Sequence, residues 1–149
     1  GPVDFSVHAE TALVYAAGLA EKLDSSLVIL HVVHDPGEAP GYYSVKGRGK
    51  QLRRMEDVAA EMLAEFLEKM QKKHPGLTAL GHATTMLVVG LPINRILEAA
   101  EKIHASMIVM ASQGRTGLAH VLLGSKAEQV VRLAHVPVMI VKSGKKHKS

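Results

Sequence analysis

The chain of 149 residues has no cysteine and no tryptophan, and only two phenylalanines and three tyrosines. Without cysteine it forms no disulfide bonds, a composition typical of proteins from a reducing compartment. So few aromatic side chains leave little on which the bases of single-stranded nucleic acid could stack. A single domain of this length buries about 68–70% of its unfolded surface. We therefore expect a hydrophobic core that needs no covalent cross-links.

Long hydrophobic runs and targeting segments are also absent. No apolar stretch reaches the roughly 20 residues that a membrane span requires, and the first residues lack the pattern of a signal peptide. These absences predict a soluble cytoplasmic protein with no membrane partner.

The formal net charge of +4 comes from one end of the chain. Four lysines follow the last apolar run, namely Lys142, Lys145, Lys146 and Lys148, and without them the charges balance. We interpret residues 1–142 as one domain and residues 143–149 as a disordered basic tail. A second basic cluster, within residues 46–54, is either solvated or reaches a phosphate-bearing ligand. Nucleic acid is not the partner that this distribution favours.

Two kinds of segment alternate along the chain. Apolar residues at helical spacing predict helices, and short continuous runs of Val, Ile and Leu predict strands buried on both faces. The helices are expected at 8–23, 51–73, 92–104 and 125–135, and the strands at 27–33, within 78–89, at 106–111 and at 137–142. Such alternation predicts an α/β fold with a doubly wound, Rossmann-like parallel sheet and helices on both faces.

The spacing also predicts which helical residues face the core. Ser6 is the expected N-cap of the first helix. The predicted inward residues are Leu13, Ala16, Ala17, Ala20 and Leu23 in the first helix, Met55, Val58, Met62, Phe66 and Met70 in the second, Ile93, Ile96, Leu97, Ala100 and Ile103 in the third, and Ala127, Val130, Val131 and Ala134 in the fourth.

A doubly wound sheet also calls for a strand before the first helix, where the sequence shows only a short extended piece, residues 1–4. Three interpretations stay open. The Gly-Pro start is a protease scar, the first strand lies upstream of residue 1, or it is truncated there. Without that strand the sheet has an open slot, which a partner or a rearrangement must fill.

Residues 111–126, ASQGRTGLAHVLLGSK, form a glycine-bearing connection between a strand and a helix. Glycines let backbone N–H groups approach an anion, and the positive end of the helix dipole favours negative charge there. The motif is neither a Walker P-loop nor a dinucleotide fingerprint, because the glycine spacings differ. Taken alone, Gly114, Gly117 and Gly124 are equally consistent with ordinary turn geometry.

Ligands of open parallel sheets bind at the carboxyl ends of the strands. Three segments of this chain lie at such ends: residues 2–4, residues 32–33 and residues 111–117. We therefore predict a nucleotide pocket in which Asp4 accepts hydrogen bonds from a ribose or base edge and backbone groups near Val32 contact a base.

Six motifs together resemble the universal stress protein family: VDFS (3–6), LHVV (30–33), GLP with a later Ile (90–96), IVMASQGRTG (108–117), LLGS (122–125) and PVMIVK (137–142). The family pattern Gly-x2-Gly-x9-Gly-[Ser/Thr] is matched by Gly114, nine residues, and Gly124-Ser125. Ala111 replaces its first glycine, and Ala127 stands where members often carry a hydroxyl.

The resemblance implies a five-stranded parallel sheet and a site for ATP, with Mg, or for AMP or cyclic AMP. It puts Asp4 and Val32 at the adenosine end and Gly114, Gly124 and Ser125 at the phosphates. It also implies a homodimer through the last strand, residues 137–142. The candidate site residues are Pro2, Val3, Asp4, Val32, Ala111, Ser112, Gly114, Arg115, Gly124, Ser125 and Lys126.

No pair of nucleophile and base stands out, and the nine histidines are scattered. Three functions remain in competition. The first is an ATP-binding module that acts in stress response through nucleotide occupancy and dimerisation. The second is a dimeric interaction protein of the same fold without a nucleotide. The third is a slow ATPase or nucleotidyl transferase.

Overall fold

A computed structural model of the chain describes residues 4–34, 48–113 and 123–142. Helices and strands alternate along these residues, as the sequence predicts. The elements are α1 (Val7–Leu23), β1 (Val28–His34), α2 (Arg48–Lys73), α3 (Thr78–Gly81), β2 (Thr84–Gly90), α4 (Pro92–Lys102), β3 (Ile108–Ala111), α5 (Ser125–Leu133) and β4 (Val138–Val141). The short helix α3 was not predicted, because its four residues were assigned to the strand region 78–89.

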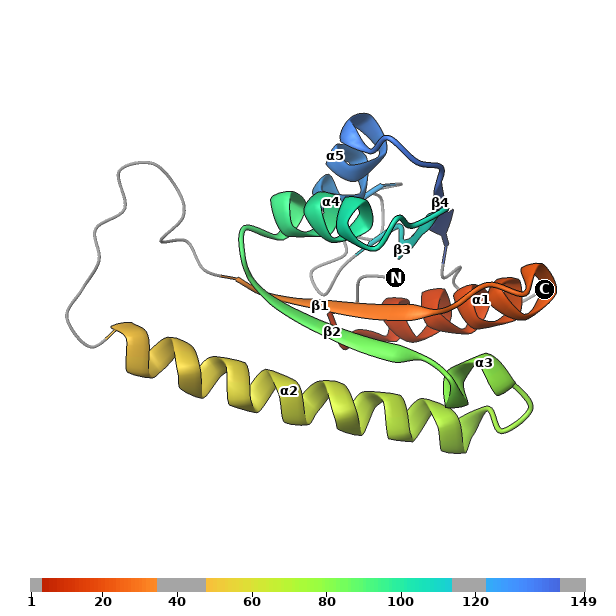
Figure 1. Cartoon of the computed structure of the whole chain (residues 1–149), viewed down its shortest axis with the longest axis horizontal. Coiled ribbons are helices and arrows are strands. Elements are labelled where there is room, and N and C mark those ends of the chain that lie inside the picture. Colours follow the sequence, from red (N-terminus) through yellow and green to blue (C-terminus); the bar gives the residue numbers. More distant parts are fainter. Residues whose placement is uncertain (1–3, 35–47, 114–122, 143–149) are drawn as a thin grey trace, which may run out of the picture.

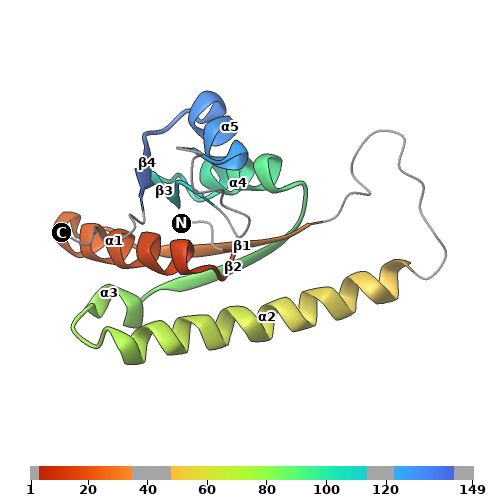
Figure 2. The same ribbon diagram turned by 180° about the vertical axis from the view of Figure 1, so that it is seen from behind.

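The helices cover the strands from two sides (Figures 1 and 2). On one side α1 packs against β3 and β4, and α2 packs against β1 and β2. On the other side α4 packs against β1 and β2, and α5 against β4. Among the described residues no helix is long and apolar enough to cross a membrane.

The strands form two parallel pairs. β1 pairs with β2 from Val28 opposite Thr84 to His34 opposite Gly90, and β3 pairs with β4 from Ile108 to Ala111. Within the described ranges no ladder joins the two pairs. The expected single five-stranded sheet is therefore found only in part, as four strands in two pairs. The described residues before α1 make a turn into the helix, with Ser6 NH donating to the Asp4 carboxylate, and form no strand.

Two apolar clusters fill the space between strands and helices. The first cluster contains Ile29 of β1 and Val109 of β3 together with residues of α1, α2 and α3. The second contains Leu30 of β1 and Met110 of β3 together with residues of α4 and α5. Neighbouring strand residues thus enter opposite clusters, which explains why the strand sequences are continuously apolar. Burying each such side chain contributes about 1.5–3 kcal/mol.

The first helix has a clear start and end signal. The Ser6 hydroxyl accepts a hydrogen bond from Ala9 NH at 3.1 Å, so the predicted N-cap is confirmed. Asp24 adopts a left-handed conformation with φ 52°, and Ser25 NH donates to the Ala20 carbonyl at 2.9 Å. This pattern ends α1 and turns the chain into β1.

Several predicted core positions are wrong, because Leu23 and Ile103 lie at helix ends and because the buried face of α2 is shifted by one residue at Ala59 and Leu63. The second helix buries Ala59, Leu63, Phe66 and Met70. Its half toward Arg48 extends away from the body of the molecule (Figure 1), and Met55 and Val58 of the expected stripe are exposed there. The predicted core residues that are exposed are Leu23, Met55, Val58, Met62, Ile103 and Val131.

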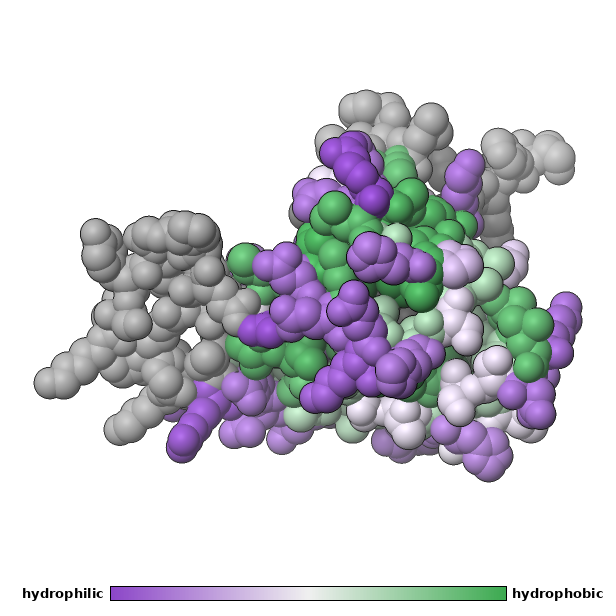
Figure 3. All heavy atoms as spheres, turned by 45° about the horizontal axis from the view of Figure 1, so that its top comes forward, coloured by the Kyte–Doolittle hydropathy of each residue, from purple (hydrophilic) through white to green (hydrophobic). Residues whose placement is uncertain are grey.

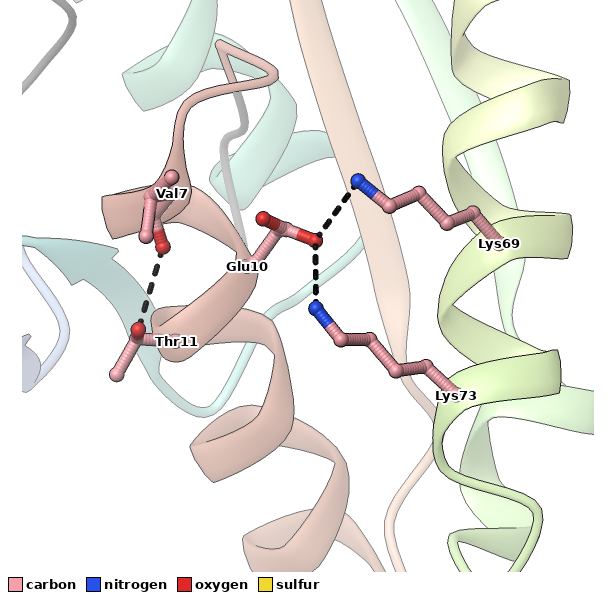
Figure 4. Close-up of polar contacts among 5 residues, drawn as sticks. All are labelled: Val7, Glu10, Thr11, Lys69 and Lys73. Carbon is pink, nitrogen blue, oxygen red and sulfur yellow. Dashed lines mark hydrogen bonds and ion pairs between the residues drawn. The ribbon is translucent and has the colours of Figure 1, made fainter.

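One ion-pair cluster connects the helices on the first side (Figure 4). The Glu10 carboxylate of α1 lies 3.3 Å from the ammonium of Lys69 and 3.8 Å from that of Lys73, both on α2. The carboxylate is largely buried while both lysines are mostly exposed, which limits the contribution of the pairs to about 1 kcal/mol or less. Their effect is to fix α1, which covers β3 and β4, to α2, which covers β1 and β2.

We predict that Gly18→Ala raises the free energy of unfolding by about 0.5–1 kcal/mol. Gly18 lies inside α1, and glycine loses more backbone entropy on folding than alanine does. A Cβ at this position meets nothing within 4 Å. Urea denaturation followed by circular dichroism measures the change. A loss of stability would contradict the packing described for α1.

Glu21 makes a pH-dependent contribution to the free energy of unfolding. Its pKa is lowered by the hydrogen bond from Ala79 NH and by that from the Thr78 hydroxyl, at 3.0 and 2.8 Å. A lowered pKa favours the folded state above the ordinary glutamate pKa near 4.5, and this contribution is lost as the pH falls through the folded pKa. We expect Glu21→Gln to be less stable than the parent chain at pH 7, with the difference shrinking below pH 4. Denaturation curves at both pH values test it, and a constant difference would refute it.

Candidate functional site

The carboxyl ends of the strands gather at one edge of the molecule. Because α1 ends at Leu23 and β1 begins at Val28, the start of α1 must lie toward the carboxyl end of β1. The centroid of the Phe5 ring lies 4.4 Å from that of His31, so the turn before α1 lies beside the middle of β1. The start of α5 lies at the same end of β3, because Gly124 NH donates to the Ser112 carbonyl at 2.6 Å.

Ser112 is the centre of this arrangement. It directly follows β3, is only 6% exposed, and donates its own N–H to the Val141 carbonyl of β4 at 3.0 Å. Its carbonyl is the acceptor for Gly124. One buried residue thus fixes the start of α5 to the ends of two strands.

The first turn of α5 offers backbone donors. Gly124 is the N-cap and provides no side-chain cap, and the first intrahelical bond described there runs from Glu128 NH to the Gly124 carbonyl at 2.9 Å. The N–H groups of Ser125, Lys126 and Ala127 precede that bond and have no acceptor within the helix. The side chains of Ser125 and Lys126 are exposed. The helix dipole, a hydroxyl and an ammonium group therefore all favour an anion at this helix start.

The two alanines of the motif have different surroundings. Ala111, the last residue of β3, is partly buried against the first cluster. Ala127 is 2% exposed and lies in the second cluster with Val130. The Ala127 methyl therefore contributes to packing between α4 and α5.

On the α1 side, Asp4 organises the turn into the helix. Its Oδ1 accepts hydrogen bonds from the Ser6 N–H at 3.0 Å and from the Ser6 hydroxyl at 2.5 Å. Phe5 between them has φ 65°, a rare conformation for a bulky residue, and its ring also contacts Phe66 of α2 at 5.7 Å. These contacts hold Asp4 beside β1.

Val32 lies in the ladder opposite Val88 of β2, and its side chain packs against the second cluster. The role of its backbone groups in a site stays a prediction from the sequence. Pro2, Val3, Gly114 and Arg115 lie outside the described residues. Within the described part of the chain, no group of three or more His, Asp or Glu side chains could hold a metal ion.

Arg95 is a cation at this edge that sequence reasoning missed. Its Nε donates to the Val89 carbonyl at the end of β2 at 2.8 Å, and its Nη1 lies 2.7 Å from Glu98 Oε2. Pro92 begins α4 directly after the strand end at Gly90, so an arginine in that first turn must lie at the same edge. The position of Arg95, three residues after Pro92, is the feature of the sequence from which this cation could have been predicted.

Comparisons with known proteins agree on one family. The model of the universal stress protein family matches residues 1–142. Two universal stress proteins of Methanocaldococcus jannaschii are similar to the chain. One is 33% identical over 145 residues, which cover 97% of this chain and 81% of that protein. The other is 30% identical over 148 residues, which cover 95% of this chain and 91% of that protein.

Solved structures share the fold. The universal stress protein UspA of Lactobacillus plantarum has a TM-score of 0.77 at 24% identity, over 94% of this chain and 93% of that one. A universal stress protein in complex with cyclic AMP has a TM-score of 0.63 at 21% identity, over 96% and 94% of the two chains. One from Archaeoglobus fulgidus in complex with dAMP has a TM-score of 0.56 at 22% identity, over 95% and 94%.

The hydrogen bonds at the start of α1 generate a prediction. Ser6→Ala removes the N-cap acceptor of Ala9 NH and should lower the free energy of unfolding by about 1 kcal/mol. Ser25→Ala is the matched control. This exposed hydroxyl lies beyond the end of α1 and makes a 3.5 Å contact with the Leu23 carbonyl. Urea denaturation of both variants compares them. Equal effects would show that Ser6 does not cap α1.

Proposed function

The chain belongs to the universal stress protein family, and we propose that it is an adenine-nucleotide-binding module whose ligand is ATP. In this proposal the nucleotide occupancy and a homodimer together carry a stress signal in the cytoplasm. The relatives in complex with cyclic AMP and dAMP support adenine-nucleotide binding in this fold. ATP is the finer part of the proposal and rests on the motif that ends in Gly124-Ser125.

One observation carries the proposal: the uncapped start of α5 is fixed to the ends of β3 and β4 through Ser112. A phosphate there accepts hydrogen bonds from N–H groups that have no acceptor in the helix. Each such contact contributes about 0.3–2 kcal/mol, so several must act together. The exposed hydroxyl of Ser125 and ammonium of Lys126 add two further groups for a phosphate.

The proposed roles divide along the edge of the strands. Asp4 and the backbone near Val32 hold the adenosine part, and Pro2 and Val3 adjoin it. The phosphates contact the stretch Ala111, Ser112, Gly114 and Arg115 and the helix start Gly124, Ser125 and Lys126. With ATP, magnesium would be held by the phosphates, and the Ser125 hydroxyl would contact a phosphate oxygen or a metal-bound water. The chemistry that the metal supplies is neutralisation of phosphate charge.

A second candidate keeps the fold without the nucleotide and acts through dimerisation. It is favoured by β4, where Met139 is exposed and Val138 and Ile140 are only partly buried. Apolar surface also gathers on the side of the molecule that carries α4 and α5 (Figure 3). In both candidates the homodimer forms through residues 137–142, as the family resemblance implies. A slow ATPase or nucleotidyl transferase is the third alternative, for which the described side chains offer no specific support.

Mass spectrometry of small molecules released from the purified, denatured protein identifies the ligand. Release of ATP supports the proposal, and AMP or cyclic AMP corrects its finer part. If no nucleotide is released and none binds in calorimetric titrations with ATP, AMP and cyclic AMP, the dimeric interaction protein replaces it.

We predict that Gly124→Val weakens ATP binding at least about tenfold, a loss of about 1.4 kcal/mol. Gly124 has φ −67° and ψ 157°, which valine also adopts, so the fold should persist while the isopropyl group crowds the phosphates. Gly76→Ala is the control, since a Cβ there meets nothing within 4 Å. Calorimetric titration and circular dichroism measure binding and folding. Unchanged affinity in Gly124→Val would remove α5 from the site.

A further inference from the structure

Phe5 has a backbone conformation that phenylalanine rarely adopts. Its φ is 65°, in the left-handed region where the Cβ of a bulky residue is crowded by a carbonyl oxygen. In the described ranges Asp24 and His104 share a positive φ, but both directly follow a helix, where left-handed residues commonly end it. Phe5 instead precedes α1. Such strain persists only where the surrounding contacts impose it.

Hydrogen bonds fix the turn around Phe5 from the side of the helix. The Asp4 carboxylate accepts hydrogen bonds from the N–H and the hydroxyl of Ser6, at 3.0 and 2.5 Å. The same Ser6 hydroxyl accepts a hydrogen bond from Ala9 NH at 3.1 Å. The orientation of the Asp4 carboxylate is therefore coupled to the first turn of α1, and Phe5 lies at the centre of this coupling.

The Phe5 ring attaches the turn to the strand. Its centroid lies 4.4 Å from that of His31 in β1, with 35° between the ring planes. It lies 5.7 Å from the centroid of Phe66 in α2, edge to face at 64°. Aromatic pairs attract one another at about these separations. Phe66 is buried in the first cluster, against which Phe5 also packs, so the ring has a defined place between the turn, β1 and α2.

Phe5 and His31 are the sequence neighbours of the two residues proposed to hold adenosine. Asp4 precedes Phe5, and Val32 follows His31. His31 and Val32 both lie in the ladder with β2, which fixes the backbone of β1 at this point. The contact between the two rings therefore sets how the Asp4 carboxylate lies relative to the Val32 backbone.

We infer that Phe5 is a positioning residue for the nucleotide and acts through its contact with His31. Phe5 holds Asp4 at the spacing from Val32 that an adenosine requires, with no need to touch the ligand itself. A site whose parts are already in place binds more tightly, because the ligand does not have to order them. The inference rests on the proposed function, since the roles of Asp4 and Val32 belong to it.

The first test is Phe5→Gly. Glycine adopts a positive φ without strain, so this variant keeps the backbone conformation of the turn and loses the ring contact. The dissociation constant for ATP should rise about tenfold, the factor that the loss of one hydrogen bond to a carboxylate brings. Calorimetric titration measures the affinity, and circular dichroism checks that the variant is folded.

Leu80→Val is the structural control. Leu80 is 1% exposed and belongs to the first cluster, like the contacts of Phe5. It lies in α3, near the other end of α1, where Ala79 NH donates to Glu21. The variant removes packing from the same cluster far from Asp4, and its affinity for ATP should stay within about twofold of that of the parent chain.

Two substitutions at His31 test the contact from the strand and do not alter the turn. His31→Phe keeps a ring against Phe5 and should bind ATP like the parent chain, whereas His31→Val loses the ring and should bind about tenfold more weakly. The double variant Phe5→Gly with His31→Val should bind about as weakly as either single variant, because both substitutions remove the same contact.

The outcomes separate this inference from the proposed function. If the parent chain binds none of ATP, AMP and cyclic AMP, the proposed function fails and the inference fails with it. If the parent chain binds ATP, three results overturn the inference alone: unchanged affinity in Phe5→Gly, an equal loss in Leu80→Val, or equally weak binding by His31→Phe and His31→Val.

Discussion

The structure depends on the packing of apolar side chains between the two strand pairs and the helices that cover them. Hydrogen-bond ladders hold each strand pair together, and within the described ranges side-chain packing, with no ladder, joins one pair to the other. The two apolar clusters supply most of this connection, because neighbouring residues such as Ile29 and Leu30 enter opposite clusters. Glu10, with its two lysines, adds a polar link between the helices that cover the different pairs. Changes in helix packing will therefore shift one strand pair relative to the other.

The candidate site lies where hydrogen bonds fix the starts of α5 and α1. Ser112 ties α5 to β3 and β4, while Asp4 and Ser6 begin α1 on the side where Phe5 contacts β1. A nucleotide that contacts both helix starts would connect the two strand pairs through its own atoms. Ligand binding and the relative position of the pairs are then linked, because a ligand that spans both stabilises one arrangement of them.

Local signals made most of the fold predictable. Ser6 identifies the start of α1, Pro92 the start of α4, and continuous apolar runs the buried strands. The pairing of strands was not fully predictable, because periodicity shows which residues are buried and not which edges meet. The predicted buried faces of the helices were wrong where a helix extends beyond the elements that pack against it, as at Met55 and Val58. Within the site, the role of the helix start at Gly124-Ser125 stays a prediction from the sequence, which missed Arg95, because the position of that side chain depends on the end of β2.

The exposed half of α2 has a chemical consequence for a chain without cysteine. Methionine is then the only sulfur that an oxidant can reach, and the seven methionines differ widely in access. Met55 is 49% and Met62 38% exposed, whereas Met70 on the same helix is completely buried. Sulfoxide formation follows exposure, so peroxide would oxidise Met55 most readily, then Met62 of α2 and Met139 of β4, which is 36% exposed. Methionines of the same helix therefore differ in their access to oxidants, since Met55 is exposed and Met70 is buried.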